Sequence, residues 1–107
     1  MGGIMTKFLF ALLAITSIQL FAGCEDGNSI ANTAALDHYF KANPEMRKFC
    51  KASSTDPELT GRNEETYSVI VKCSKGATRT FIYSVVLKEI EDAVCVVKKV
   101  KALAVQG

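Results

Sequence analysis

The stretch that decides the fold is residues 66–100, TYSVIVKCSKGATRTFIYSVVLKEIEDAVCVVKKV. It is rich in β-branched and aromatic residues, and apolar and polar positions alternate along it with the period of a strand. Two short polar interruptions, Ser74-Lys75-Gly76 and Glu91-Asp92, are typical of tight turns between antiparallel strands. The pattern predicts a meander of three strands, over 66–73, 77–90 and 93–100.

The two turns set the register of this meander. A three-residue loop with Gly76 in the left-handed position pairs Cys73 with Ala77, and a two-residue turn at Glu91-Asp92 pairs Ile90 with Ala93. One face of the sheet then forms the core: Tyr67, Val69, Val71, Cys73, Phe81, Tyr83, Val85, Leu87, Val94, Val96 and Val100. The other face carries an apolar patch: Ile70, Ile82, Val86, Ile90 and Val97. This patch fits either a partner-binding surface or a sheet face screened by lysine side chains.

The segment before the strands has a helical period. Leu36, Tyr39 and Phe40 stand at i, i+3 and i+4, and a second such set ends at Cys50. Asn43-Pro44 interrupts between them, because proline disfavours helical geometry in the residue before it. The fold class that we expect is α+β: one kinked N-terminal helix packed on a three-stranded antiparallel β-meander, with a loop over 52–65.

Composition excludes several classes of function. The chain has 107 residues, with 13 basic and 11 acidic side chains, one His and no Trp. This length fits one domain, and the charge balance does not indicate a nucleic-acid-binding protein. His38 has no cysteine partner at metal-ligand or nucleophile spacing, and the paired carboxylates fall in loops and turns. We expect no catalytic residues, no metal and no cofactor, and a protein that is not an enzyme.

The N-terminus has the features of an export signal. Lys7 precedes an apolar run over 8–22 that is at or below the length of a spanning helix, and translation can start at Met1 or Met5. We expect a signal peptide over 1–23, a tether over 24–32 and a single small domain over 33–107. Leu20-Phe21-Ala22-Gly23-Cys24 resembles the lipobox of bacterial lipoproteins.

That resemblance implies that Cys24 carries lipid and anchors the protein to the membrane of a bacterial cell envelope, facing the periplasm or the surface. Ordinary cleavage after Cys24 and an uncleaved anchor helix are the alternatives. The Glu25 that follows Cys24 leaves the choice between inner and outer membrane open.

Export to an oxidising compartment favours disulfides. Cys73 and Cys95 would lie two strand spacings apart, about 9–10 Å, beyond the ~4.4–6.8 Å that a disulfide spans between Cα atoms. Cys73 faces the helix, and Cys50 lies on the apolar stripe of that helix, so we expect a Cys50–Cys73 disulfide. Cys95 is then left over, either as a small apolar residue or as a link between two copies.

Four short features together resemble the small entry-exclusion lipoproteins of conjugative plasmids: Cys24, Tyr39-Phe40, Asn43-Pro44-Glu45 and Cys50. The resemblance covers under a third of the chain, and such chains usually stop soon after a second Cys. It implies a lipid-anchored envelope protein that blocks redundant conjugative transfer through contact with an unknown protein partner.

Two alternatives remain. A helix on an antiparallel sheet with a disulfide is similar to cystatin-like inhibitors and binding modules, although the chain lacks their Gln-x-Val-x-Gly and Pro-Trp hairpins. The other alternative is a structural subunit of an envelope complex.

Overall fold

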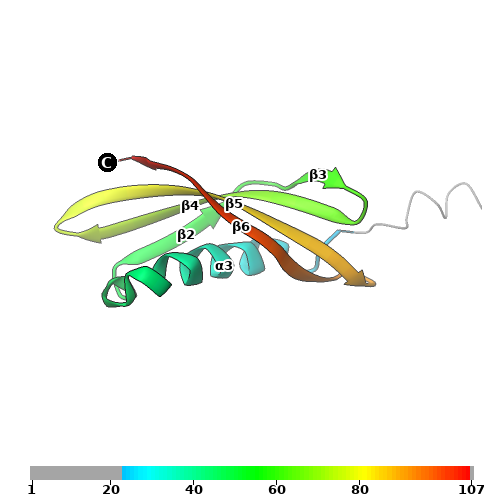
Figure 1. Ribbon diagram of the computed structural model, residues 1–107, viewed down its shortest axis with the longest axis horizontal. Coiled ribbons are helices and arrows are strands. Elements are labelled where there is room, and N and C mark those ends of the chain that lie inside the picture. Colours follow the sequence, from blue (N-terminus) through cyan, green and yellow to red (C-terminus); the bar gives the residue numbers. More distant parts are fainter. Residues whose placement is uncertain (1–22, 107) are drawn as a thin grey trace, which may run out of the picture.

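The computed structural model describes residues 23–106, in which one helix lies along one face of an antiparallel sheet (Figure 1). The elements, in chain order, are the helix α3 (Gly27–Ala42), a 3-10 turn (Pro44–Met46), and the strands β2 (Cys50–Ser54), β3 (Glu58–Gly61), β4 (Glu64–Lys75), β5 (Ala77–Glu91) and β6 (Val94–Gln106). The α+β class is therefore confirmed. The expected signal peptide, up to residue 22, lies outside the described residues.

The sheet has five strands, where the sequence predicted three. The two additional strands, β2 and β3, follow one another along the same edge of β4, and both are antiparallel to it. Pro57 lies between them, where the missing N–H of proline suits an interruption of the ladder. Most of their side chains are exposed, so the apolar alternation that marks a half-buried strand is weak in this segment.

The helix begins at Gly27, within the segment that was expected to be a tether, and its buried face starts with small residues. Gly27, Ala31 and Ala35 recur every four positions and are buried against the sheet. Such residues give little apolar signal, yet they let the helix backbone come close to the strands. The helix ends where Asn43 donates hydrogen bonds from its backbone N–H and its Nδ2 to the carbonyl of Tyr39, each at 3.1 Å.

The kinked second half of the helix is not present. After the 3-10 turn the chain enters β2 at Cys50, so the apolar spacing that ends there does not continue the helix. Pro44 at the first position of the turn has no N–H to extend the preceding helical ladder. None of the helices formed by residues 23–106 is long and apolar enough to span a bilayer.

The first hairpin keeps the predicted faces although its register differs from the prediction. Lys75 pairs with Ala77 around Gly76, whose φ of 82° is the left-handed conformation expected of it. Cys73 therefore pairs with Arg79 instead of Ala77, a shift of two residues. Because side chains alternate with a period of two, such a shift preserves the face. Most predicted core residues of these strands are buried: Tyr67, Val69, Val71, Cys73, Tyr83, Val85 and Leu87.

The second hairpin contradicts the prediction for the start of β6. Leu87 pairs with Val97 instead of the expected Val96, a shift of one residue that reverses the faces of this part of β6. Val94 and Val96 are therefore exposed, and Cys95 turns into the core. The turn contains Ala93 at φ 62° rather than a glycine. Its backbone N–H donates to Glu89 Oε2 at 2.7 Å, and its carbonyl accepts from the Glu25 N–H at 2.9 Å. These two bonds hold a left-handed residue that sequence patterns alone do not reveal.

Two disulfides close the fold. The expected Cys50–Cys73 bond is present and joins residues that face each other across the β2–β4 ladder. The second bond joins Cys24 to Cys95, where the sequence predicted a lipid on Cys24 and an unpaired Cys95. A sulfur atom in a disulfide cannot also hold a thioether to lipid, and Cys95 has no thiol left to link two copies. The Cys95 prediction failed because the shifted register of β6 turns this side chain towards the helix.

The two disulfides should contribute unequally to stability. Cys24→Ser with Cys95→Ser should lower the free energy of unfolding by about 4 kcal/mol, and Cys50→Ser with Cys73→Ser by about 3 kcal/mol, because the longer closed loop restricts the unfolded chain more. The sequence separations are 71 and 23 residues. Urea denaturation of each double variant measures both losses. A larger loss for the Cys50–Cys73 pair would contradict this entropic account.

The close approach of α3 to the sheet should make Gly27 intolerant of a side chain. A Cβ built there would lie 1.8 Å from the hydroxyl oxygen of Tyr67, so Gly27→Ala must displace that ring or the helix. We expect a loss of about 1–3 kcal/mol, measured by thermal denaturation. Ser29→Ala, on the exposed side of the same helix, is the matched control and should change stability by less than about 0.5 kcal/mol.

Candidate functional site

The predicted partner-binding patch does not form one surface. Ile70 and Ile82 face each other across the β4–β5 ladder on the side away from the helix, and both are half-buried, as is Val86. Ile90 is exposed near the turn at the end of β5. Val97 pairs with the core residue Leu87, so it belongs to the helix side of the sheet and not to this patch. Ile90 continues the face of Ile82 and Val86 along β5, so Val97 is the member of the set that lies on the other side of the sheet.

A more distinctive surface is the long edge strand β6, which the sequence prediction cut short. This strand has 13 residues and lies at the end of the strand order, with β5 on one side and no strand of the described chain on the other. Five large apolar side chains along it are exposed: Val94, Val96, Val97, Leu103 and Val105. The signal that could have revealed its length is the absence of any Gly or Pro between Val94 and Gln106.

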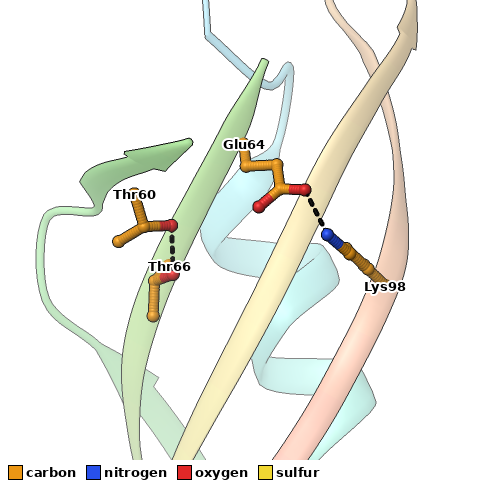
Figure 2. Close-up of polar contacts among 4 residues, drawn as sticks. All are labelled: Thr60, Glu64, Thr66 and Lys98. Atoms are coloured by element: carbon orange, nitrogen blue, oxygen red, sulfur yellow. Dashed lines mark hydrogen bonds and ion pairs between the residues drawn. The ribbon is translucent and has the colours of Figure 1, made fainter. Parts of the chain in front are cut away.

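Irregularities in the β5–β6 ladder shape this edge. Lys98 and Leu103 have no partner on β5, because the register shifts at each of them. Such bulges strengthen the local twist and redirect side chains. Lys98 reaches across β5 to form an ion pair with Glu64 of β4, as Figure 2 shows. A hydrogen bond between the hydroxyls of Thr60 and Thr66, 2.7 Å long, ties β3 to the other side of β4 (Figure 2).

An apolar groove lies beside the C-terminal half of β6. We call it the β6 groove; its volume is about 470 Å³, and it is lined by Tyr39, Phe81, Tyr83, Ala102, Leu103, Ala104 and Val105. Tyr39 of the helix packs on Phe81 with ring centroids 4.6 Å apart, and His38 meets the ring of Tyr83 edge-on at 5.5 Å. The groove therefore has an aromatic wall from α3 and β5 and an aliphatic wall from β6.

The aromatic wall carries a neutral polar group. Burial raises the pKa of the Tyr83 hydroxyl, and the nearby Tyr39 raises it further. Tyr83 therefore stays protonated at ordinary pH. A protonated phenol can donate a hydrogen bond to a carbonyl or carboxylate in the groove.

The charge along β6 has one sign. Lys98, Lys99 and Lys101 are exposed, and the strand contains no acidic residue. Lys98 is paired with Glu64, whereas Lys99 and Lys101 stand opposite the uncharged Val86 and Ser84. The edge consequently presents two lysines without an acidic residue opposite them on β5.

A second hollow lies at the start of the helix, and we call it the N-terminal pocket. It measures about 540 Å³ and is lined by Gly23, Cys24, Asp26, Gly27, Asn28, Ser29, Pro57, Glu65 and Tyr67. Glu65 is the buried charged residue of the described chain, with only 7% of its surface exposed. Tyr67 donates a hydrogen bond to Glu65 Oε1 at 2.7 Å.

The residues considered for catalysis lie apart. His38 is exposed on α3, and all four cysteines are in disulfides. Within residues 23–106, no three His, Cys, Asp or Glu side chains gather in a way that could hold a metal ion.

The buried tyrosine of the N-terminal pocket should make stability fall at high pH. Burial, the hydrogen bond to Glu65 and the negative charge of Glu65 all raise the pKa of Tyr67 above its ordinary 10.0. Because the folded pKa is the higher one, the stabilisation is fully present below pH 10 and is lost as the pH rises beyond it.

The slope should approach about 1.4 kcal/mol per pH unit for each such tyrosine. Urea denaturation between pH 9 and pH 11.5 measures it. Tyr67→Phe should reduce this dependence of the unfolding free energy on pH. An unchanged slope in the variant would show that burial of Tyr67 does not hinder its ionisation.

No protein-family model, no curated protein and no solved structure matches the chain.

Proposed function

We propose that the protein is an exported binding module that recognises an extended segment of a partner protein and adds it as a strand to the free edge of β6. The observation that carries the proposal is the position of the β6 groove, directly beside a long strand edge without a partner in the described chain. An unpaired edge offers main-chain hydrogen bonds, and a neighbouring pocket for alternate side chains adds specificity.

The β6 groove offers contacts to the side chains of an incoming strand, in addition to the main-chain hydrogen bonds of the edge. A strand laid along β6 would point alternate side chains to the helix side, where Tyr39, Phe81 and Leu103 line an apolar hollow. Leu103, at a bulge in the ladder, is 53% exposed, so an incoming apolar side chain could cover it. Burial of apolar area at such a contact stabilises the complex by roughly 25 cal/mol per Å² before the costs of association.

Charge selects an acidic segment as the partner. Antiparallel pairing of β6 with a second copy over its whole length places Val94 opposite Gln106 and Lys99 opposite Lys101, twice in each dimer. Like charges directly opposite each other destabilise a strand pair. Carboxylates on the partner strand would instead meet Lys99 and Lys101, which have no acidic residue opposite them on β5.

The lysines also have a simpler role, because lysine on an edge strand hinders association with other copies. That role does not call for an aromatic-lined groove next to the strand. The lysines hinder pairing of β6 with a second copy of the chain, and the groove provides apolar contacts. Together the lysines and the groove suit an edge that binds a different, acidic segment.

Export is supported by the apolar N-terminal run and by two disulfides, which form and persist in oxidising compartments. The contact-based role expected of an entry-exclusion protein is compatible with the β6 edge. Because the Cys24 sulfur is bonded to Cys95, the proposal includes no lipid anchor. Peptide mapping of the exported protein without reduction should recover Cys24 linked to Cys95. An acylated Cys24 would contradict the export form proposed here.

A designed peptide tests the binding mode. A peptide of roughly ten alternating Val and Glu residues, long enough to follow most of β6, should bind saturably in calorimetry. Leu103→Asp should weaken the binding at least tenfold, because it places a charge in the groove and repels the acidic peptide. Leu59→Asp is the matched control. Leu59 is also an exposed leucine on an edge strand, but it lies on β3, at the opposite edge of the sheet, and its replacement should leave the affinity unchanged.

Three further outcomes decide the proposal. The same peptide with alternate backbone nitrogens methylated should not bind, because it cannot complete the ladder on the paired side. A peptide with Lys in place of Glu should bind much more weakly. Equal binding of the methylated peptide, or self-association of the protein through β6 in sedimentation experiments, would overturn the proposal.

A further inference from the structure

The buried Glu65 lacks a cationic partner. Of its two carboxylate oxygens, Oε1 accepts the hydrogen bond from Tyr67, and no described residue donates one to Oε2. Among residues 23–106 the ion pair that forms is Lys98–Glu64, which lies elsewhere on the sheet. The Glu65 side chain is 7% exposed, and Oε2 keeps contact with solvent at the N-terminal pocket, so a cation placed in this pocket can pair with it.

The N-terminal pocket does not supply this cation from its side chains. Its other charged residue is Asp26, which is also acidic, and the remaining lining residues are neutral. The pocket adjoins the start of α3, where the helix dipole offsets a negative charge by roughly 0.3–1 kcal/mol.

The chain at Gly23 passes close to Glu65 Oε2. A Cβ built on Gly23 would be 3.3 Å from Glu65 Oε2, and Gly23 has the left-handed φ of 95° that lets the chain pass there. The next residues are held firmly: Cys24 by its disulfide to Cys95, and Glu25 by its N–H, which donates to the carbonyl of Ala93 at 2.9 Å. Any group on the nitrogen of Gly23 or Cys24 is therefore kept at the pocket.

We propose that the missing cation is the α-amino group of the chain itself, created when the export signal is cut off immediately before Gly23 or Cys24. The inference rests on the proposed export. Hydrolysis of the peptide bond places the hydroxyl of water on the carbonyl carbon of the leader and a proton on the nitrogen. That nitrogen takes a further proton at neutral pH, because the pKa of an α-amino group is about 8. A neutral amide beside Glu65 thereby becomes a positive charge.

Removal of the leader then changes the stability of the fold. The unprocessed chain holds Glu65 against an uncharged amide, and the processed chain pairs it with an ammonium group fixed by the Cys24–Cys95 disulfide. The mature protein is accordingly more stable than the same chain with its leader attached. The contact site on β6 lies outside this pocket, so binding of a partner strand does not depend on the pair.

The test compares the processed chain with a free α-amino group and the same chain acetylated at that group. Acetylation should lower Tm by at least about 4 °C, the shift that 1 kcal/mol produces in a domain of this size. In Glu65→Gln, which keeps an acceptor for Tyr67, acetylation should change Tm by less than a quarter of that amount. Glu25→Gln, at an exposed carboxylate close to the same terminus, is the control and should keep the full effect.

Sequencing of the exported protein locates its first residue. A mature chain that begins upstream of Gly23, or an equal effect of acetylation in Glu65→Gln and in the parent, would overturn the inference while leaving the proposed export and β6 binding in place. Failure of the acidic peptide to bind would remove the proposed contact function without touching the pairing of Glu65. Retention of the protein without export would remove the source of the new terminus.

Discussion

The covalent link between Cys24 and Cys95 is the constraint on which most of the structure depends. It joins the residues just before α3 to the start of β6, two segments that are 71 positions apart in the chain. Between these anchor points the helix must lie across the sheet, and its small buried residues Ala31 and Ala35 allow it to come close. The link also fixes the side of β6 that faces the core, because the Cys95 side chain has to point towards the helix. A chain of this size has a modest apolar core, so such a covalent link matters more than it would in a larger domain.

The same link lies between the two hollows of the molecule, the N-terminal pocket and the β6 groove. At the helix start it holds the backbone over Glu65 and Tyr67, which gives the N-terminal pocket its shape. At the sheet edge it anchors one end of β6 and leaves the opposite half free of covalent ties. The β6 groove forms at that free half, where the exposed Leu103 and Val105 line it together with Tyr39 of the helix. The disulfide holds the start of β6, and the C-terminal half of the strand is exposed. This arrangement suits the proposed binding of a partner strand in a defined position.

The two glutamates next to each other on β4 illustrate how strand geometry assigns different roles to similar residues. Glu64 points to the side away from the helix and pairs with Lys98, and Glu65 points to the helix side and is buried. An exposed ion pair of the first kind contributes little, typically up to about 1 kcal/mol. A buried carboxylate of the second kind strongly favours any nearby positive charge. Alternation along the strand therefore turns one acidic dipeptide into a surface ion pair and a buried acceptor for the Tyr67 hydroxyl.

The amino-acid sequence by itself determined the α+β class, the positions of the two hairpins along the chain, and the buried faces of β4 and β5. It also paired Cys50 with Cys73, although it placed Cys50 on the helix and the structure places it at the start of β2. The faces depend on local periodicity and on the turn at Gly76, and an error of two residues in the β4–β5 register left the faces of these two strands unchanged. Only the tertiary structure decided the helix start, the strands β2 and β3, the inward direction of Cys95 and its bond to Cys24. Each of these depends on contacts between distant segments: small residues that pack against a sheet, an edge that pairs along β4, and a left-handed Ala93 held by Glu89 and Glu25. A bulge or a one-residue shift reverses the faces of a strand, and no local pattern in β6 marks where those shifts fall.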